Sequence, residues 1–111
     1  MRILLAHNSL YYPSMGGGDK SNRLLMEALA ARGHRVRVVA RVEKFGVPAH
    51  EKLLSELASR GIVVDTSSRD VKFMRGGVEV HALTLDPHPR EYFEARIAEF
   101  DPDVIVTSTD D

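Results

Sequence analysis

The first 41 residues constrain the fold most, because two short apolar runs flank one amphipathic segment. The runs at residues 2–6 and 36–41 predict buried strands, and the segment at residues 19–32 has the spacing of a helix. Gly33 follows that segment directly, where a glycine favours the end of a helix. A strand, a helix and a second strand in this order predict a β-α-β unit with its two strands parallel.

A run of glycines stands where this helix is expected to begin. Exposed backbone N–H groups and the positive end of the helix dipole make such a place a natural anion site. Asp19 is a suitable N-cap residue, so we expect the helix to start near it. The candidate phosphate-binding residues are Gly16, Gly17, Gly18 and Asp19. The alternative is a flexible surface turn. The spacing fits neither a dinucleotide fingerprint nor a P-loop.

The rest of the chain continues the alternation of strands and helices. We expect Leu25, Ala28 and Leu29 to form the buried face of the first helix. The later elements are predicted as a helix from Pro48 to Gly61, strands at 62–64 and 104–106, a hairpin pairing 71–74 with 78–83, and a helix ending near Phe100. The expected fold class is α/β: a single Rossmann-like three-layer domain, residues 1–111, with a mostly parallel sheet and an inserted β-hairpin.

Ligands of open α/β sheets bind beyond the carboxyl ends of the parallel strands. His7, Asn8 and Tyr11 follow the first strand, so we consider them as candidate contacts for a ligand bound at this edge. The alternative roles are local capping by His7 and Asn8, and fastening of a long loop by Tyr11. Arg35, Arg37 and Arg41 alternate along the second strand, which predicts a solvated side of its end; Arg41 is the one placed to meet a phosphate.

Composition excludes several classes of protein. A formal net charge of −1 gives no general attraction for nucleic acid, and no apolar run reaches membrane-spanning length. The chain has no cysteine and no apolar leader before His7, so we expect a cytoplasmic protein. The histidines are scattered without carboxylates at ligand spacing, and we expect no metal site.

The segment LMEALAARGHRV at residues 25–36, preceded by the Gly16-Gly17 pair and followed by valines, resembles the opening of a family 4 glycosyltransferase. The hairpin at 77–81 and the segment DPDVI at 101–105 are also similar to the N-terminal half of such enzymes. The resemblance covers the whole chain, and its specific part is the first 40 residues. These enzymes are retaining transferases with two Rossmann-like domains, the GT-B architecture.

The resemblance implies transfer of a sugar from a nucleotide-diphosphate donor to an acceptor hydroxyl, in a cleft between the two domains. Gly16 and Gly17 would then bring N–H groups to the donor phosphates, with Gly18 and Asp19 as neighbours, and His7, Asn8 and Tyr11 would face the acceptor. No cofactor and no metal are expected. The partners would be the donor, the acceptor and a C-terminal domain.

The chain departs from the family pattern in two respects. The paired glutamates and nucleotide pocket of the C-terminal domain are absent from it, and after the last strand it has Thr107-Ser108-Thr109 where many relatives have histidine. We therefore assign no catalytic residue and expect the fragment alone to be inactive. The alternative is a freestanding Rossmann-like module that binds nucleotide or phosphate. An apolar, unfinished sheet edge near residues 104–106 would favour the transferase.

Overall fold

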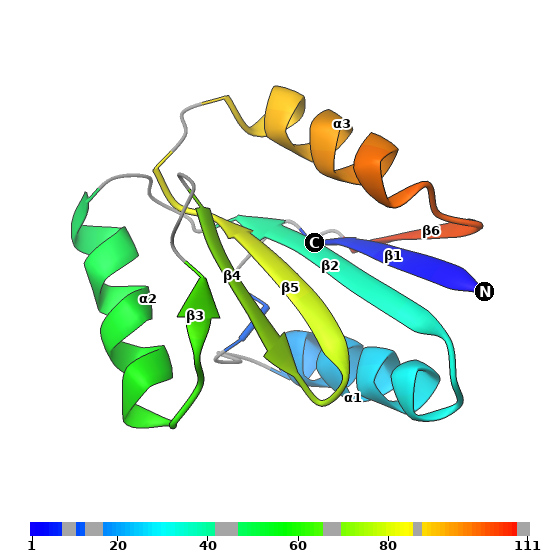
Figure 1. The fold of residues 1–111 in the computed structure, drawn as a ribbon, viewed down its shortest axis with the longest axis horizontal. Helices are drawn as coiled ribbons and strands as arrows, with labels where there is room; N and C mark the ends of the chain where they lie inside the picture. The colour runs from blue at the N-terminus through cyan, green and yellow to red at the C-terminus, as the bar shows by residue number, and fades with distance from the viewer. Residues whose placement is uncertain (8–10, 13–16, 42–46, 66–69, 86–87, 109–111) are drawn as a thin grey trace.

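The computed structural model describes residues 1–7, 11–12, 17–41, 47–65, 70–85 and 88–108. In chain order the elements are β1 (Arg2–His7), α1 (Gly17–Ala31), β2 (Arg35–Arg41), α2 (Val47–Ser59), β3 (Val64–Asp65), β4 (Asp70–Arg75), β5 (Val78–Leu83), α3 (Pro89–Phe100) and β6 (Val104–Ser108). Figure 1 shows α1 and α3 on opposite sides of the sheet. The chain is therefore α/β, as its alternating pattern predicts.

All six strands belong to one sheet, in the order β3-β4-β5-β2-β1-β6. The pairs β1–β2, β1–β6 and β2–β5 are parallel, whereas β3–β4 and β4–β5 are antiparallel. The expected mostly parallel sheet is thus corrected to a mixed one. The hairpin is the cause, because its second strand takes the place beside β2 and carries the first strand into the same sheet.

The two faces of the sheet bury two separate apolar clusters. Along β1, Leu5 contributes to the cluster that includes residues of α1 and α2, while Leu4 contributes to a smaller cluster with Phe100 of α3. Successive strand residues point to opposite faces, so one strand can supply both clusters. Both side chains are fully buried. The β-α-β unit expected from the first 41 residues is present, and β1 lies between β2 and β6.

The buried face of α1 differs from the one predicted. Met26 is 1% exposed, whereas Leu25 is 51% exposed and Ala28 lies at the surface. The residues facing the sheet are Met26, Leu29 and Ala30, which have the same spacing as the predicted set but are moved along by one residue. Both sets contain Leu29, so helical periodicity alone permits either rotation of the helix.

Glycines form the two turns at which the sequence predicts them. Gly33 ends α1 with φ +94°, and the next N–H, that of His34, donates to the carbonyl oxygen of Leu29 at 3.3 Å. Gly76 and Gly77 connect β4 to β5 with φ +59° and +79°. Positive φ at both central residues is typical of tight hairpin turns, and it favours glycine there.

The two edge strands also differ from expectation. The strand predicted at 62–64 is the two-residue β3, because the N–H of Ile62 still donates to the carbonyl of Leu57 at the end of α2, and Val63 is 89% exposed. At the other edge, β6 is not buried on both sides: Val104 and Ile105 are 41% and 51% exposed. No helix in the described ranges is long and apolar enough to cross a membrane.

Candidate ligand-binding edge of the sheet

Four parallel strands end at the same edge of the sheet. The register pairs His7 of β1 with Ala40 of β2 and with Ser108 of β6. It also pairs Arg41 of β2 with Leu83 of β5. The carboxyl ends of β1, β2, β5 and β6 therefore lie side by side, which is where open α/β sheets bind ligands.

The expected phosphate-binding residues stand at the start of α1. Gly16 lies outside the described residues. Gly17, Gly18 and Asp19 form the first turn of α1, which begins at Gly17. Asp19 is therefore inside the helix, and the expectation that it caps the helix is corrected. The N–H groups of a first helical turn have no partner within the helix, so the backbone of Gly17 and Gly18 is suited to an anion.

The expected acceptor residues are buried where they are described. His7 and Tyr11 are both 0% exposed and pack edge to face, with ring centroids 6.0 Å apart. The Tyr11 hydroxyl donates to the carbonyl oxygen of Arg23 on α1, at 3.5 Å. Burial, helped by the nearby Glu27 carboxylate, raises the pKa of the Tyr11 phenol, so it stays protonated. In this conformation Tyr11 fastens its segment to α1 and offers no surface to an acceptor. Asn8 lies outside the described residues.

Two polar pairs at the edge were not predicted. His50 Nδ1 lies 2.7 Å from Thr84 Oγ1, which joins α2 to the end of β5. The Tyr92 hydroxyl of α3 donates to the carboxylate of Asp70 on β4 at 2.5 Å, and Asp70 is 3% exposed. Burial and this carboxylate raise the pKa of Tyr92. The partners are 34 and 22 residues apart in sequence, so no local pattern connects them.

A charged cluster lies between the sheet and α3, farther from the edge. Arg37 donates to Glu79 Oε1 at 2.7 Å and to Glu99 Oε1 at 2.9 Å, and it is 4% exposed. The predicted solvated position for Arg37 is therefore wrong: its guanidinium is covered by α3 and lies 4.9 Å from the ring centroid of Phe100. His81 Nε2 lies 2.7 Å from the same Glu79 oxygen.

These contacts shift the ionisation of the cluster. Burial lowers the pKa of His81, and the hydrogen bond with Glu79 opposes that effect only in part. Burial alone would raise the pKa of Glu79, but His81 and Arg37 together hold it below its ordinary value. At neutral pH the cluster is an Arg37 cation, a Glu79 anion and a neutral His81 that donates from Nε2. Its geometry suits fastening α3 to the sheet.

Within the described residues, no group of three or more histidines or carboxylates is arranged to hold a metal ion. Comparison of the chain with protein families, with curated proteins and with solved structures gives no match. This edge of the sheet combines an anion-suited helix start with the carboxyl ends of four parallel strands.

Proposed function

We propose that this chain is the acceptor-side, N-terminal Rossmann-like domain of a retaining GT-B glycosyltransferase, which moves a sugar from a nucleotide-diphosphate donor to an acceptor hydroxyl. The observation that carries the proposal is the β1-α1-β2 unit, in which α1 begins with Gly17 and Gly18 after the strand at the centre of the parallel pairs. The proposal also rests on the resemblance of residues 25–36 to such enzymes.

The start of α1 suits the chemistry of the donor. Cleavage of a nucleotide-sugar bond leaves negative charge on a diphosphate, and preorganised N–H donors stabilise such a charge as it develops. Gly17 and Gly18 have no side chains to keep a phosphate away from their backbone. The role assigned to this turn is therefore electrostatic stabilisation of the leaving diphosphate, and no proton-transfer step is assigned to the chain.

The exposed edge strand supports the presence of a further domain. Val104 and Ile105 of β6 point to opposite faces and are 41% and 51% exposed. The outer edge of β6 has no strand beside it within the described residues. An apolar edge of this kind is a surface on which further elements pack. In the proposed enzyme, a C-terminal domain would hold the nucleotide, the domain described here would hold the acceptor, and the cytoplasm would be its location.

The buried positions of His7 and Tyr11 refine this proposal. Neither side chain has exposed surface, so acceptor contacts by either one require the segment after β1 to shift. The donor-phosphate role of Gly17 and Gly18 needs no such shift, because it uses the backbone. The first experiment therefore tests the donor side.

The test is a titration of the ¹⁵N-labelled chain with UDP, GDP and ADP, in which the amide chemical shifts report binding. We expect weak binding without strong preference among the nucleotides, with the largest shifts at Gly17 and Gly18. Gly18→Asp should remove these shifts, because a carboxylate there stabilises the helix start but repels phosphate. Ser55→Asp adds the same charge on an exposed part of α2 and should leave them unchanged.

Two results would count against the proposal. Shifts that are absent from the first turn of α1, or that survive Gly18→Asp, would remove its central observation. Tight and selective binding of a single nucleotide would instead support a freestanding nucleotide-binding module, since the donor's base is expected to be recognised by the C-terminal domain.

A further inference from the structure

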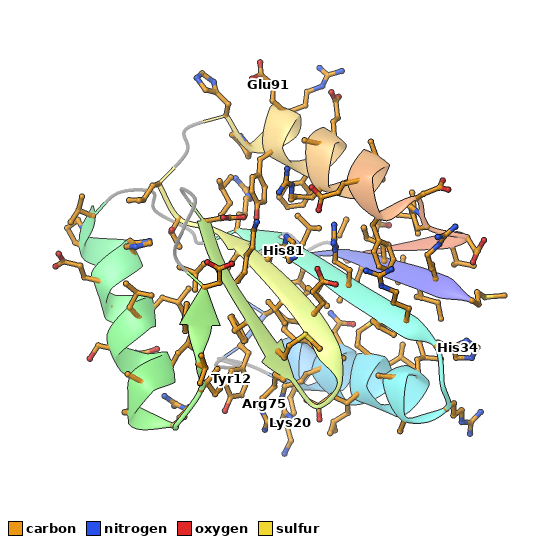
Figure 2. The ribbon with its side chains drawn as sticks, in the orientation of Figure 1. Tyr12, Lys20, His34, Arg75, His81 and Glu91 are labelled. Carbon is orange, nitrogen blue, oxygen red and sulfur yellow. The ribbon has the colours of Figure 1, made fainter. Side chains whose placement is uncertain are left out.

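Three arginines surround Tyr12, on the side of the sheet occupied by α1 and α2. Three guanidinium groups lie within 6 Å of the centroid of its ring: Arg75 at 4.8 Å, Arg23 at 5.9 Å and Arg60 at 5.9 Å. They come from β4, α1 and the residue that follows α2. Figure 2 shows Tyr12 and Arg75 together in the region between these two helices.

Positive charge at this site exceeds negative charge. Arg23 is paired with Glu27 at 3.3 Å, whereas Arg60 and Arg75 have no carboxylate partner among the described residues. Arg60 donates to the carbonyl oxygen of Glu56, and the guanidinium of Arg75 makes no hydrogen bond to any described residue. Like charges brought together in this way repel one another, so an anion bound between them would lower the electrostatic energy.

The packing around the site holds these groups in place. The Tyr12 ring packs against Phe73 of β4, with centroids 6.4 Å apart, and this fixes its position over the sheet. Beside it, the hairpin turn packs tightly against α1: a methyl group on Gly76 would lie only 2.6 Å from Cδ of Glu27. The same Glu27 side chain forms the ion pair with Arg23. Arg75, just before the turn, is left as the half-buried cation with open hydrogen-bonding capacity.

We infer that the arginines around Tyr12 bind the phosphate group of a small phosphate-bearing molecule. The planar guanidinium presents N–H groups in a fork that matches phosphate oxygens, and a tetrahedral phosphate has enough oxygens to accept from two forks at once. Arg75 and Arg60 supply these donors, and Arg23 adds positive charge.

This site is separate from the start of α1. Arg75 pairs with Val78, the first residue of β5, and so lies at the edge opposite to the carboxyl ends of the parallel strands. Arg23, the member of the site on α1, is six residues after Gly17, or about 9 Å along the helix. The inference therefore goes beyond the proposed function and can be tested independently of it.

The experiment is a titration of the ¹⁵N-labelled chain with pyrophosphate at low ionic strength, followed at the Arg75 Nε–H and at the amides of Gly76 and Gly77. We expect saturable shifts that weaken as salt is added. Arg75→Gln should weaken binding about tenfold, the effect of losing one charge-assisted interaction. Arg60→Gln, at an exposed position, should also weaken pyrophosphate binding and serves as the second variant.

Two controls separate this site from other anion binding. Arg90→Gln removes a similar charge from α3, on the other side of the sheet, where the side chain is 91% exposed, and should leave the titration unchanged. Gly18→Asp should also leave it unchanged, whatever its effect on nucleotide binding at the start of α1. Loss of binding in either control variant would overturn the inference, since binding would then follow net charge or the other site.

The source of the phosphate is resolved by comparing ligands. Equal affinity for pyrophosphate and UDP supports recognition of phosphate alone, and tighter binding of UDP that Arg75→Gln weakens supports a nucleotide as the ligand. Binding of uridine at the same amides would overturn the inference, because uridine carries no phosphate. Absence of any shift at Arg75, Gly76 and Gly77 with pyrophosphate would overturn it as well.

Discussion

Arg37 on β2 and Glu79 on β5 form an ion pair of 2.7 Å beneath α3, although they are 42 residues apart in the chain. The Arg37 side chain is 5% exposed and the Glu79 side chain 26% exposed. Glu79 also receives a hydrogen bond from His81, and Arg37 reaches Glu99 on α3. One buried arginine thereby links two neighbouring strands to the helix that covers them.

Removing this arginine should destabilise the protein strongly. Arg37→Met leaves Glu79 half-buried without its cation, and we expect unfolding by urea to show a loss of about 3 kcal/mol. In a Glu79→Gln background the same change should cost clearly less, because the unpaired charge is gone. Arg90→Met, at an exposed position, should change stability by no more than about 0.5 kcal/mol. Equal losses for Arg37→Met in both backgrounds would contradict a coupled pair.

Stability should fall as the solution is acidified through the range in which His81 titrates. The pKa of His81 is lowered in the folded chain, so the unfolded chain binds more protons just below pH 6.5. The free energy of unfolding is therefore highest above pH 6.5 and declines as pH falls towards the folded-state pKa. Glu79, whose pKa is also lowered, adds a second decline below pH 4.5. Urea midpoints measured across this range check both signs.

His81→Gln isolates the first of these two declines. The variant should show a flatter dependence between about pH 7 and pH 5 while keeping the loss at lower pH. His34→Gln, in the turn between α1 and β2, removes a histidine outside the cluster and serves as the matched control. A slope that follows His34 instead of His81 would show that the cluster does not govern this dependence.

Which face of α1 packs on the sheet can be tested by truncating two neighbouring side chains. Met26 is fully buried, so Met26→Ala should cost about 3 kcal/mol through lost burial and the cavity left behind. Leu25 is half exposed, so Leu25→Ala should cost less than about 1 kcal/mol. Chemical unfolding of the two variants gives the comparison. The reverse order would mean that the helix presents the face expected from the sequence pattern.

The hairpin turn should be more sensitive to an added methyl group than an open turn with similar backbone geometry. Gly61 has φ +73° and nothing within 4 Å of the place that an added methyl group would occupy, so Gly61→Ala should cost about 1 kcal/mol from backbone strain alone. Gly76→Ala should cost more, because its methyl group must displace Glu27 from Arg23. Adding Glu27→Ala should bring the two costs together; if the difference persists in thermal or urea unfolding, the contact with Glu27 is not its cause.

The site was predictable only in part, for reasons that differ between residues. The start of α1 was predicted to within two residues, because three consecutive glycines before a helical pattern are a local signal. His50 with Thr84 and Tyr92 with Asp70 were not visible, since each pair is formed by elements that meet only in the folded sheet. The arginines around Tyr12 were missed for the same reason: they come from three different elements.

The sequence by itself determined the elements whose causes are local. Gly33 ends α1, and Gly76 and Gly77 form the hairpin turn, because positive φ favours glycine wherever the chain must reverse. The tertiary structure decided how these elements combine. It placed β5 beside β2 and made the sheet mixed, turned Met26 and not Leu25 inward, and covered Arg37 with α3. Backbone conformation depends on neighbours along the chain, whereas burial and charge pairing depend on groups that only the complete fold brings together.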